Sequence, residues 1–166
     1  IEQLFLLFIS LFLLTVKGGL TFISGDDSDD YNHCETAASC NGLIVTIFNS
    51  AISLSRVKNT QKDVLALGIT GGQALAAFQS WQSGSGFSAD VLSTDNEIMN
   101  VDFSKYKVIY MPSSELQVSG GISCAQLTLV SSRSDSIKYF VNTLKGSLMT
   151  LTQDGCTSGY TFLVVP

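Results

Sequence analysis

The stretch DVLALGITGGQALAAFQSW, residues 63–81, decides the fold. Its first part, Asp63–Ile69, is a short and nearly continuous apolar run, which is typical of a strand buried on both faces in a parallel sheet. Thr70-Gly71-Gly72 then makes a turn, and Gln73–Trp81 continues with apolar residues at helical spacing. A buried strand that leads through a glycine turn into a helix is the repeating unit of an α/β protein.

The alternation of strands and helices continues toward the C-terminus. Ser123 and Gln126 have the spacing of a capping box, which predicts the start of a helix that runs to Leu144 and stops at Gly146. The remaining apolar runs predict strands at Leu43–Leu54, Ser88–Ser93, Tyr106–Met111, Ser147–Thr152 and Phe162–Val165. We therefore expect a doubly wound, mainly parallel sheet of the flavodoxin-like type over residues 43–166.

Composition limits the classes of partner. A chain of 166 residues that is 45% hydrophobic and 14% charged can form one domain with a substantial core. The formal net charge is −5 and the sequence contains no run of lysines and arginines. We therefore expect no nucleic-acid partner, because phosphate binding depends on clustered basic side chains. We expect no cofactor and no metal. The expected partner is a second copy of the chain or another extracellular subunit.

The first 24 residues form an apolar leader. Leu4–Val16 is interrupted only by Ser10 and Thr15 and precedes Lys17-Gly18-Gly19, a pattern typical of a secretory signal peptide and too short for an ordinary membrane span. Alternatively, the segment is retained in the mature protein and is buried against a neighbouring subunit. Contact with a membrane is expected only if the segment is retained. The residues of this assembly segment are Leu4, Phe5, Leu6, Leu7, Phe8, Ile9, Leu11, Phe12, Leu13 and Leu14. Either reading places the protein outside the cell or at its surface.

Residues 25–42 read as a polar linker. Cys34 and Cys40 are spaced for a small disulfide-closed loop, whereas a zinc site that includes His33 would need a different ligand spacing. The linker also carries the acidic residues Asp26, Asp27, Asp29 and Asp30. This cluster lacks the regular alternation of a calcium loop, so we interpret it as solvated.

A second disulfide is expected between Cys124 and Cys156. Cys124 starts a helix and Cys156 follows a strand, and both kinds of position lie along the same edge of a doubly wound sheet. The alternative for Cys124 is a reactive thiolate that is stabilised by the positive end of the helix dipole. In an exported protein with a partner thiol available, the sequence favours the disulfide.

Several segments together resemble the class I glutamine amidotransferase-like superfamily. They are DVLALG with its glycine turn and helix, SADVLS, VDFSKYKVIYMPSS and SIKYFVNTLKGSLMTLTQDG, between Asp63 and Gly155. The resemblance rests on the arrangement of these segments and looks most like the secreted, non-amidotransferase branches. It implies a flavodoxin-like fold. It also implies that a complete domain continues beyond Pro166.

The resemblance also implies where a catalytic nucleophile would stand. Catalytic members place a Cys or Ser directly after the strand that corresponds to Ser147–Thr152, with a His later in the chain. Here that position reads Gln153-Asp154-Gly155, Cys156 lies beyond it, and the sole histidine is His33. The sequence therefore predicts a catalytically degenerate member.

A ligand could still bind where the strands end. The predicted ligand edge comprises Thr70, Gly71, Gly72, Ser113, Glu115, Gln153 and Asp154. The glycine turn fits no phosphate-binding fingerprint, so its glycines are interpreted as turn geometry. Two functions follow: a non-catalytic secreted structural or interaction domain, such as a filament subunit, or part of an exported hydrolase or carbohydrate-binding domain.

Overall fold

The computed structural model describes residues 19–25, 27–30, 38–153, 155–156, 160 and 162–163, with the backbone alone for residues 38–40. The expected Cys34–Cys40 disulfide, His33 and the assembly segment Leu4–Leu14 fall outside the described residues or side chains. Within the described part, no helix is both long and apolar enough to cross a membrane.

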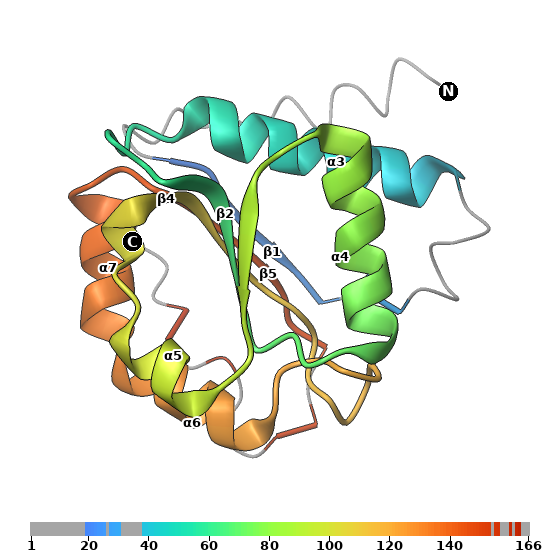
Figure 1. Cartoon of the computed structure of the whole chain (residues 1–166). Coiled ribbons are helices and arrows are strands. Elements are labelled where there is room, and N and C mark those ends of the chain that lie inside the picture. Colours follow the sequence, from blue (N-terminus) through green and yellow to red (C-terminus); the bar gives the residue numbers. More distant parts are fainter. Residues whose placement is uncertain are drawn as a thin grey trace.

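A five-stranded sheet, parallel at every pairing, forms the centre of the molecule (Figure 1). Its strands are β1 (Thr21–Ser24), β2 (Lys62–Leu67), β3 (Ala89–Leu92), β4 (Tyr106–Met111) and β5 (Ser147–Leu151), and they lie in the order β1-β5-β4-β2-β3. The predicted α/β class with a parallel sheet is confirmed. Read from β3, the first four positions follow the flavodoxin order, and the fifth position is taken by the N-terminal strand β1.

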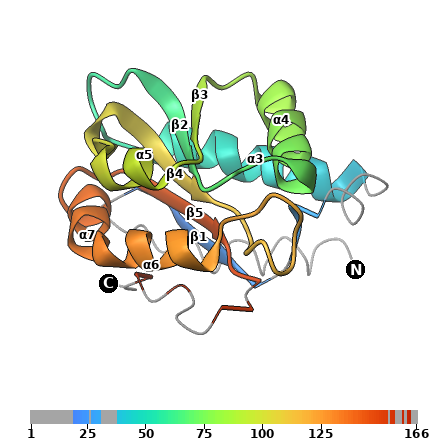
Figure 2. The ribbon, with the colours of Figure 1, turned by 60° about the horizontal axis from the view of Figure 1, so that its bottom comes forward.

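Helices cover both faces of the sheet (Figure 2). The helical segments are α3 (Ala38–Leu54), α4 (Gly72–Ser85), α5 (Asp95–Asn100), the short 3₁₀ segment η1 (Phe103–Lys105), α6 (Cys124–Ser132) and α7 (Ser134–Asn142). Helices α3 and α4 pack on one face, and α5, α6 and α7 pack on the other. This is the doubly wound arrangement that the sequence predicts.

Alternating strand residues supply the two cores. Val64, Val108 and Tyr110 face α3 and α4, whereas their neighbours Leu65 and Ile109 face the other helices. The first core is rich in rings, because Phe48 of α3 contacts an aromatic group at centroid distances of 4.9–6.1 Å. The members of that group are Phe78, Trp81, Phe87 and Tyr110.

The predicted strand at Leu43–Leu54 is wrong, because these residues belong to helix α3. The run is rich in β-branched residues, which favours a strand locally. Its buried side chains, however, are Ile44, Phe48 and Ala51, and they recur at helical spacing against the sheet. Packing of this face overrides the local β preference.

The predicted helix from Ser123 to Leu144 is two helices that meet at Arg133. The capping box of Ser123 and Gln126 is present at the start of α6. The Arg133 guanidinium donates hydrogen bonds to the carbonyls of Ile98 and Val101 and lies 4.0 Å from the Phe103 ring centroid. These contacts fix the break between α6 and α7 onto the end of α5.

The sheet begins inside the stretch that the sequence assigns to the leader. Thr21–Ser24 pairs with β5 in the register Thr21↔Leu148, and Ser147 Oγ accepts a hydrogen bond from the amide of Leu20 at 3.0 Å. At the other end of the chain, Phe162 and Leu163 do not form a strand, and the rest of the predicted strand Phe162–Val165 lies outside the described residues. The edge position beside β5 is taken by β1, which comes from the N-terminal end of the described residues.

Candidate functional site

The carboxyl edge of the sheet between β2 and β4 is where a fold of this class positions a ligand. The chain leaves β2 for β3 on one side and later returns across β2 to form β4, so the connections diverge at this point. The loop after β2, Gly68–Gly71, and the loop after β4, Pro112–Ser123, border the edge. A ligand of such a fold would lie between these two loops.

The protein itself occupies that space. The amide of Thr70 donates to the carbonyl of Gly120 at 2.9 Å, and the amide of Ala74, in the first turn of α4, donates to the carbonyl of Ser119 at 3.1 Å. A Cβ atom on Gly120 would lie 1.9 Å from the carbonyl oxygen of Gly71. The two backbones are therefore in direct contact, and the amides of Thr70 and Ala74, which could otherwise help to hold a phosphate or a carboxylate, already have partners. We call residues 118–122 the plug loop.

The structure brings most of the predicted ligand edge together around the plug loop. Ser113 is buried and its carbonyl accepts the amide of Ile122 at 3.1 Å, while the amide of Glu115 donates to the Ile122 carbonyl at 2.9 Å. Gln153 joins them, because its carbonyl accepts the amide of Ser114 at 3.0 Å. Thr70 and Glu115 have exposed side chains, and Asp154 lies outside the described residues.

Gly71 and Gly72 form the turn itself. Gly72 has φ +55°, and a Cβ atom there would lie 2.4 Å from Ser119 Oγ. Both the backbone angle and the close approach of the plug loop require glycine at this position. The geometry gives these residues a structural role at the junction of the two loops.

Asp29 is a member of the site that the sequence does not single out. Its side chain is fully buried, and its two oxygens accept hydrogen bonds from the amide and the hydroxyl of Ser113, each at 2.7 Å. The interpretation of the acidic cluster as solvated is therefore wrong for Asp29. The carboxylate joins the loop after β1 to the end of β4. The side chain of the neighbouring Asp30 accepts a 2.6 Å hydrogen bond from the side-chain amide (Nε2) of Gln73.

The surroundings of Asp29 change its acidity. Burial raises the pKa of Asp29 to about 6, and the hydrogen bonds from Ser113 oppose the increase only in part. Tyr110 lies near it, and burial together with the Asp29 charge raises the pKa of that phenol well above its usual value. Asp29 can therefore exchange a proton near neutral pH.

Some buried polar atoms at this edge have no hydrogen-bond partner within the described part of the chain. They are the hydroxyl oxygens of Tyr110 and Ser114 and the side-chain oxygen of Gln153. Unpaired buried oxygens are uncommon in folded proteins and are often satisfied by bound water or a ligand. This edge therefore retains some capacity to hold small polar molecules.

Asp29 predicts a pH dependence of stability. A folded-state pKa near 6 against a usual 3.8 means that the stabilising contribution of Asp29 is complete below about pH 4 and is lost as the pH rises through about 6. The D29N variant mimics the protonated acid and keeps an acceptor for Ser113. We expect it to be more stable than the parent at pH 7 by up to about 3 kcal/mol, with that advantage absent at pH 4. Urea unfolding at both pH values measures the difference.

The D29A variant is the matched control. It removes the hydrogen bonds to Ser113 together with the charge, so it should lose stability at pH 4, where D29N does not. A D29N variant that is equally destabilised at both pH values would contradict the assignment of Asp29 as a buried, titrating acid.

Cys124 and Cys156 form a disulfide, as predicted, with sulfur atoms 2.02 Å apart and Cα atoms 5.4 Å apart. The bond joins the first residue of α6 to the segment after β5. Because both thiols are consumed, neither the thiolate alternative for Cys124 nor a pairing of Cys156 with a histidine is available in this state. Among the described residues, no group of three or more His, Cys, Asp and Glu side chains is placed to hold a metal ion.

Comparison of the chain with protein-family models, with curated proteins and with solved structures found no match. The likeness to the glutamine amidotransferase-like superfamily therefore rests on the sequence segments quoted above. The geometry of the carboxyl edge carries the functional argument.

Proposed function

We propose that this protein is a non-catalytic structural or interaction domain that is exported and serves as a subunit of an extracellular assembly. The observation that carries the proposal is the plug loop, because its carbonyls accept hydrogen bonds from the amides of Thr70 and Ala74 at the edge where a fold of this class binds its ligand. A protein built in this way presents surfaces to other proteins in place of an open crevice.

The disulfide supports export. A bond between Cys124 and Cys156 persists in oxidising environments and is rare in the cytosol, where thiols are kept reduced. The apolar leader points in the same direction. The proposed compartment is the cell exterior or surface.

The resemblance supports the absence of catalysis. At the place where catalytic members of the superfamily carry a nucleophile, this chain has Gln153-Asp154-Gly155. The nearest thiol beyond it belongs to Cys156 and is held in a disulfide. We therefore propose a degenerate member of the glutamine amidotransferase-like superfamily.

The test is the state of the full chain after secretion from a eukaryotic host. We expect particles larger than the 17.8 kDa monomer in sedimentation velocity, and ordered polymers in negative-stain electron microscopy. A strict monomer at all concentrations, together with turnover of a panel of ester and amide substrates, would contradict the proposal. If the chain is a monomer and turns over none of these substrates, the proposal that it is a subunit of an assembly is contradicted, whereas the proposal that it is non-catalytic stands.

A second candidate is a carbohydrate-binding or partial hydrolase domain. The specific observation in its favour is the set of unpaired buried oxygens of Tyr110, Ser114 and Gln153 at the carboxyl edge. Sugars supply hydroxyl donors to such acceptors. Saturation-transfer NMR with common monosaccharides tests it, and a Tyr110→Phe variant that loses the signal while it stays folded would support it.

A further inference from the structure

The amino edge of the sheet is basic although the chain as a whole is acidic. Most of its lysines and arginines lie in the segments that lead into β2, β4 and β5. Backbone hydrogen bonds join these segments: the amide of Arg56 donates to the Lys145 carbonyl at 2.9 Å, and the amide of Gln61 donates to the Lys105 carbonyl at 2.8 Å. We call the exposed or half-exposed cations Arg56, Lys58, Lys62, Lys105 and Lys145 the basic edge.

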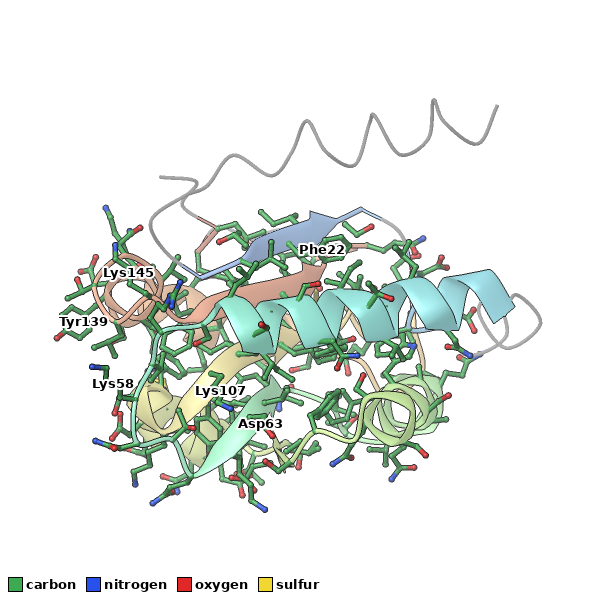
Figure 3. All side chains as sticks on the ribbon, turned by 90° about the horizontal axis from the view of Figure 1, so that it is seen from above. Phe22, Lys58, Asp63, Lys107, Tyr139 and Lys145 are labelled. Carbon is green, nitrogen blue, oxygen red and sulfur yellow. A yellow bond between two sulfur atoms is a disulfide. The ribbon has the colours of Figure 1, made fainter. Side chains whose placement is uncertain are left out.

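The basic edge surrounds an open hollow. Three cations, Arg56, Lys58 and Lys105, line it against one carboxylate, that of Asp102. The rest of the lining consists of the polar residues Asn59, Gln61, Ser104 and Thr143 and the apolar residues Val57 and Leu144. Lys58 and Lys145 lie at the same end of the molecule in Figure 3. A surface that combines cations with hydrogen-bonding amides and hydroxyls suits carboxylates.

Within the described part of the chain, the basic edge keeps most of its positive charge, because Asp102, which interacts with Lys105, is the carboxylate that opposes it. Among the described residues the ion pair at this end joins Lys107 to Asp63, at 2.8 Å, and no carboxylate lies within ion-pair distance of the basic edge itself. Asp102, which lies near these cations, carries a negative charge. Its carboxylate accepts hydrogen bonds from the amide and the hydroxyl of Ser104.

The opposite edge is acidic. The segments that follow the strands carry Asp27 and Asp30 after β1, Asp95 and Glu97 after β3, and Glu115 after β4. The described residues that follow the strands at this edge include no lysine or arginine. Asp95, Glu97 and Glu115 are exposed, and we call these three residues the acidic edge.

The parallel sheet explains the separation. Because every strand runs in the same direction, all segments that enter strands lie at one end and all segments that leave them lie at the other. The two charged ends are therefore separated by the length of the strands, roughly 20 Å. This distance exceeds the Debye length of about 8 Å at physiological salt, so each end acts as a separate surface.

We propose that the basic edge of one copy of this chain docks on the acidic edge of a second copy. The inference rests on the proposed function and names the partner of the assembly. The chain itself carries both complementary surfaces, which is what favours a second copy over a foreign polyanion. A contact between two different edges is heterologous, so it leaves a free basic edge at one end and a free acidic edge at the other, and it propagates into a ring or a filament.

The experiment reverses each edge separately. The first variant is R56E/K58E/K62E, which changes the formal charge of the basic edge from +5 to −1. The second is D95K/E115K, which changes that of the acidic edge from −3 to +1 and spares Glu97 because its carboxylate completes the capping box of α5. Each variant alone has two ends of like charge, and we expect its association constant to fall by about tenfold or more. An equimolar mixture of the two, or one chain that carries all five changes, should restore association because complementary edges meet again.

The matched controls change charge away from both edges. Lys138 and Asp135 are exposed on α7, so K138E and D135K should leave association unchanged. Sedimentation velocity at about 0.05 M and about 0.5 M salt gives the readout, and the parent should dissociate at the higher salt. Circular dichroism confirms that each variant is folded.

The outcomes separate the inference from the proposed function. If the parent assembles and both edge variants assemble equally well, the docking inference is overturned and the proposed function stands. If the parent remains monomeric under all conditions, the docking inference fails together with the assembly part of the proposed function. If the parent is monomeric but binds a sulfated polysaccharide, and R56E/K58E/K62E abolishes that binding, the partner of the basic edge is a polyanion and the inference is overturned.

Discussion

Replacing Gly120 with valine is expected to lower the free energy of unfolding by about 4 kcal/mol. Gly120 has φ +79°, which costs a β-branched residue about 1–2 kcal/mol. Its Cβ would also lie 1.9 Å from the carbonyl oxygen of Gly71, so the plug loop must move away from the turn after β2. Overpacking against backbone adds about 1–3 kcal/mol. Urea unfolding followed by tryptophan fluorescence measures the loss.

Gly86 provides the matched control for this variant. It has nearly the same backbone angle, φ +72°, but a Cβ there meets no atom within 4 Å. G86V should therefore cost only the conformational strain, about 1–2 kcal/mol. Equal losses in G120V and G86V would mean that the plug loop yields easily and that the crevice behind it can open. That result would weaken the functional proposal.

Removal of the Cys124–Cys156 disulfide is expected to cost about 4 kcal/mol. The two cysteines are 32 residues apart, and a closed loop of that size restricts the unfolded chain by about this amount. We expect the C124A/C156A variant to unfold at a clearly lower urea concentration than the parent. Alanine is the better replacement, because Cys156 packs against the core under α6 and α7 and a serine would place a hydroxyl there.

Reductant supplies the comparison for the disulfide. It should lower the unfolding midpoint of the parent to that of C124A/C156A. Any further shift of the variant in reductant reports on the remaining pair, Cys34 and Cys40, whose disulfide is still a prediction. An oxidised parent that alkylates at four thiols, or a variant as stable as the parent, would contradict the assigned role of this bond.

The sequence predicts the parts of the fold that depend on local pattern. The run at β4, Tyr106–Met111, is found with the predicted bounds, because a buried central strand is apolar over most of its length, here at every position except Lys107. The pairing of Cys124 with Cys156 is also correct, since the topology of a parallel sheet brings helix starts and strand ends to one edge. Both predictions need only the apolar pattern of a buried strand and the topology of a parallel sheet.

Features that depend on contacts between distant segments cannot be predicted from local sequence patterns. The α3 segment has the composition of a strand, and only its packing through Phe48 and Ala51 makes it a helix. Asp29 has the same local sequence context as its acidic neighbours, and only the end of β4 makes it a buried acid. The basic edge is assembled from segments that are far apart in the sequence, so no run of lysines and arginines indicates it.

The candidate site lies between these two cases. The carboxyl edge and residues such as Ser113 and Gln153 can be named from the strand ends alone. The sequence does not predict that residues 118–122 fill the space, because glycines such as Gly120 and Gly121 permit both an open ligand-binding loop and a closed one. The close approach of two backbones becomes visible only in the structure.

The place of β1 in the sheet has a consequence for biosynthesis. β1 is among the first described residues to leave the ribosome, yet its partner in the sheet is the last strand, β5. At about 5–20 residues per second, roughly 6–25 s pass before that partner emerges. During this time Phe22 has no strand beside it, and the half-built sheet offers an open edge to chaperones or to a neighbouring nascent chain. Folding of this domain is therefore completed only after β5 has emerged and has paired with β1.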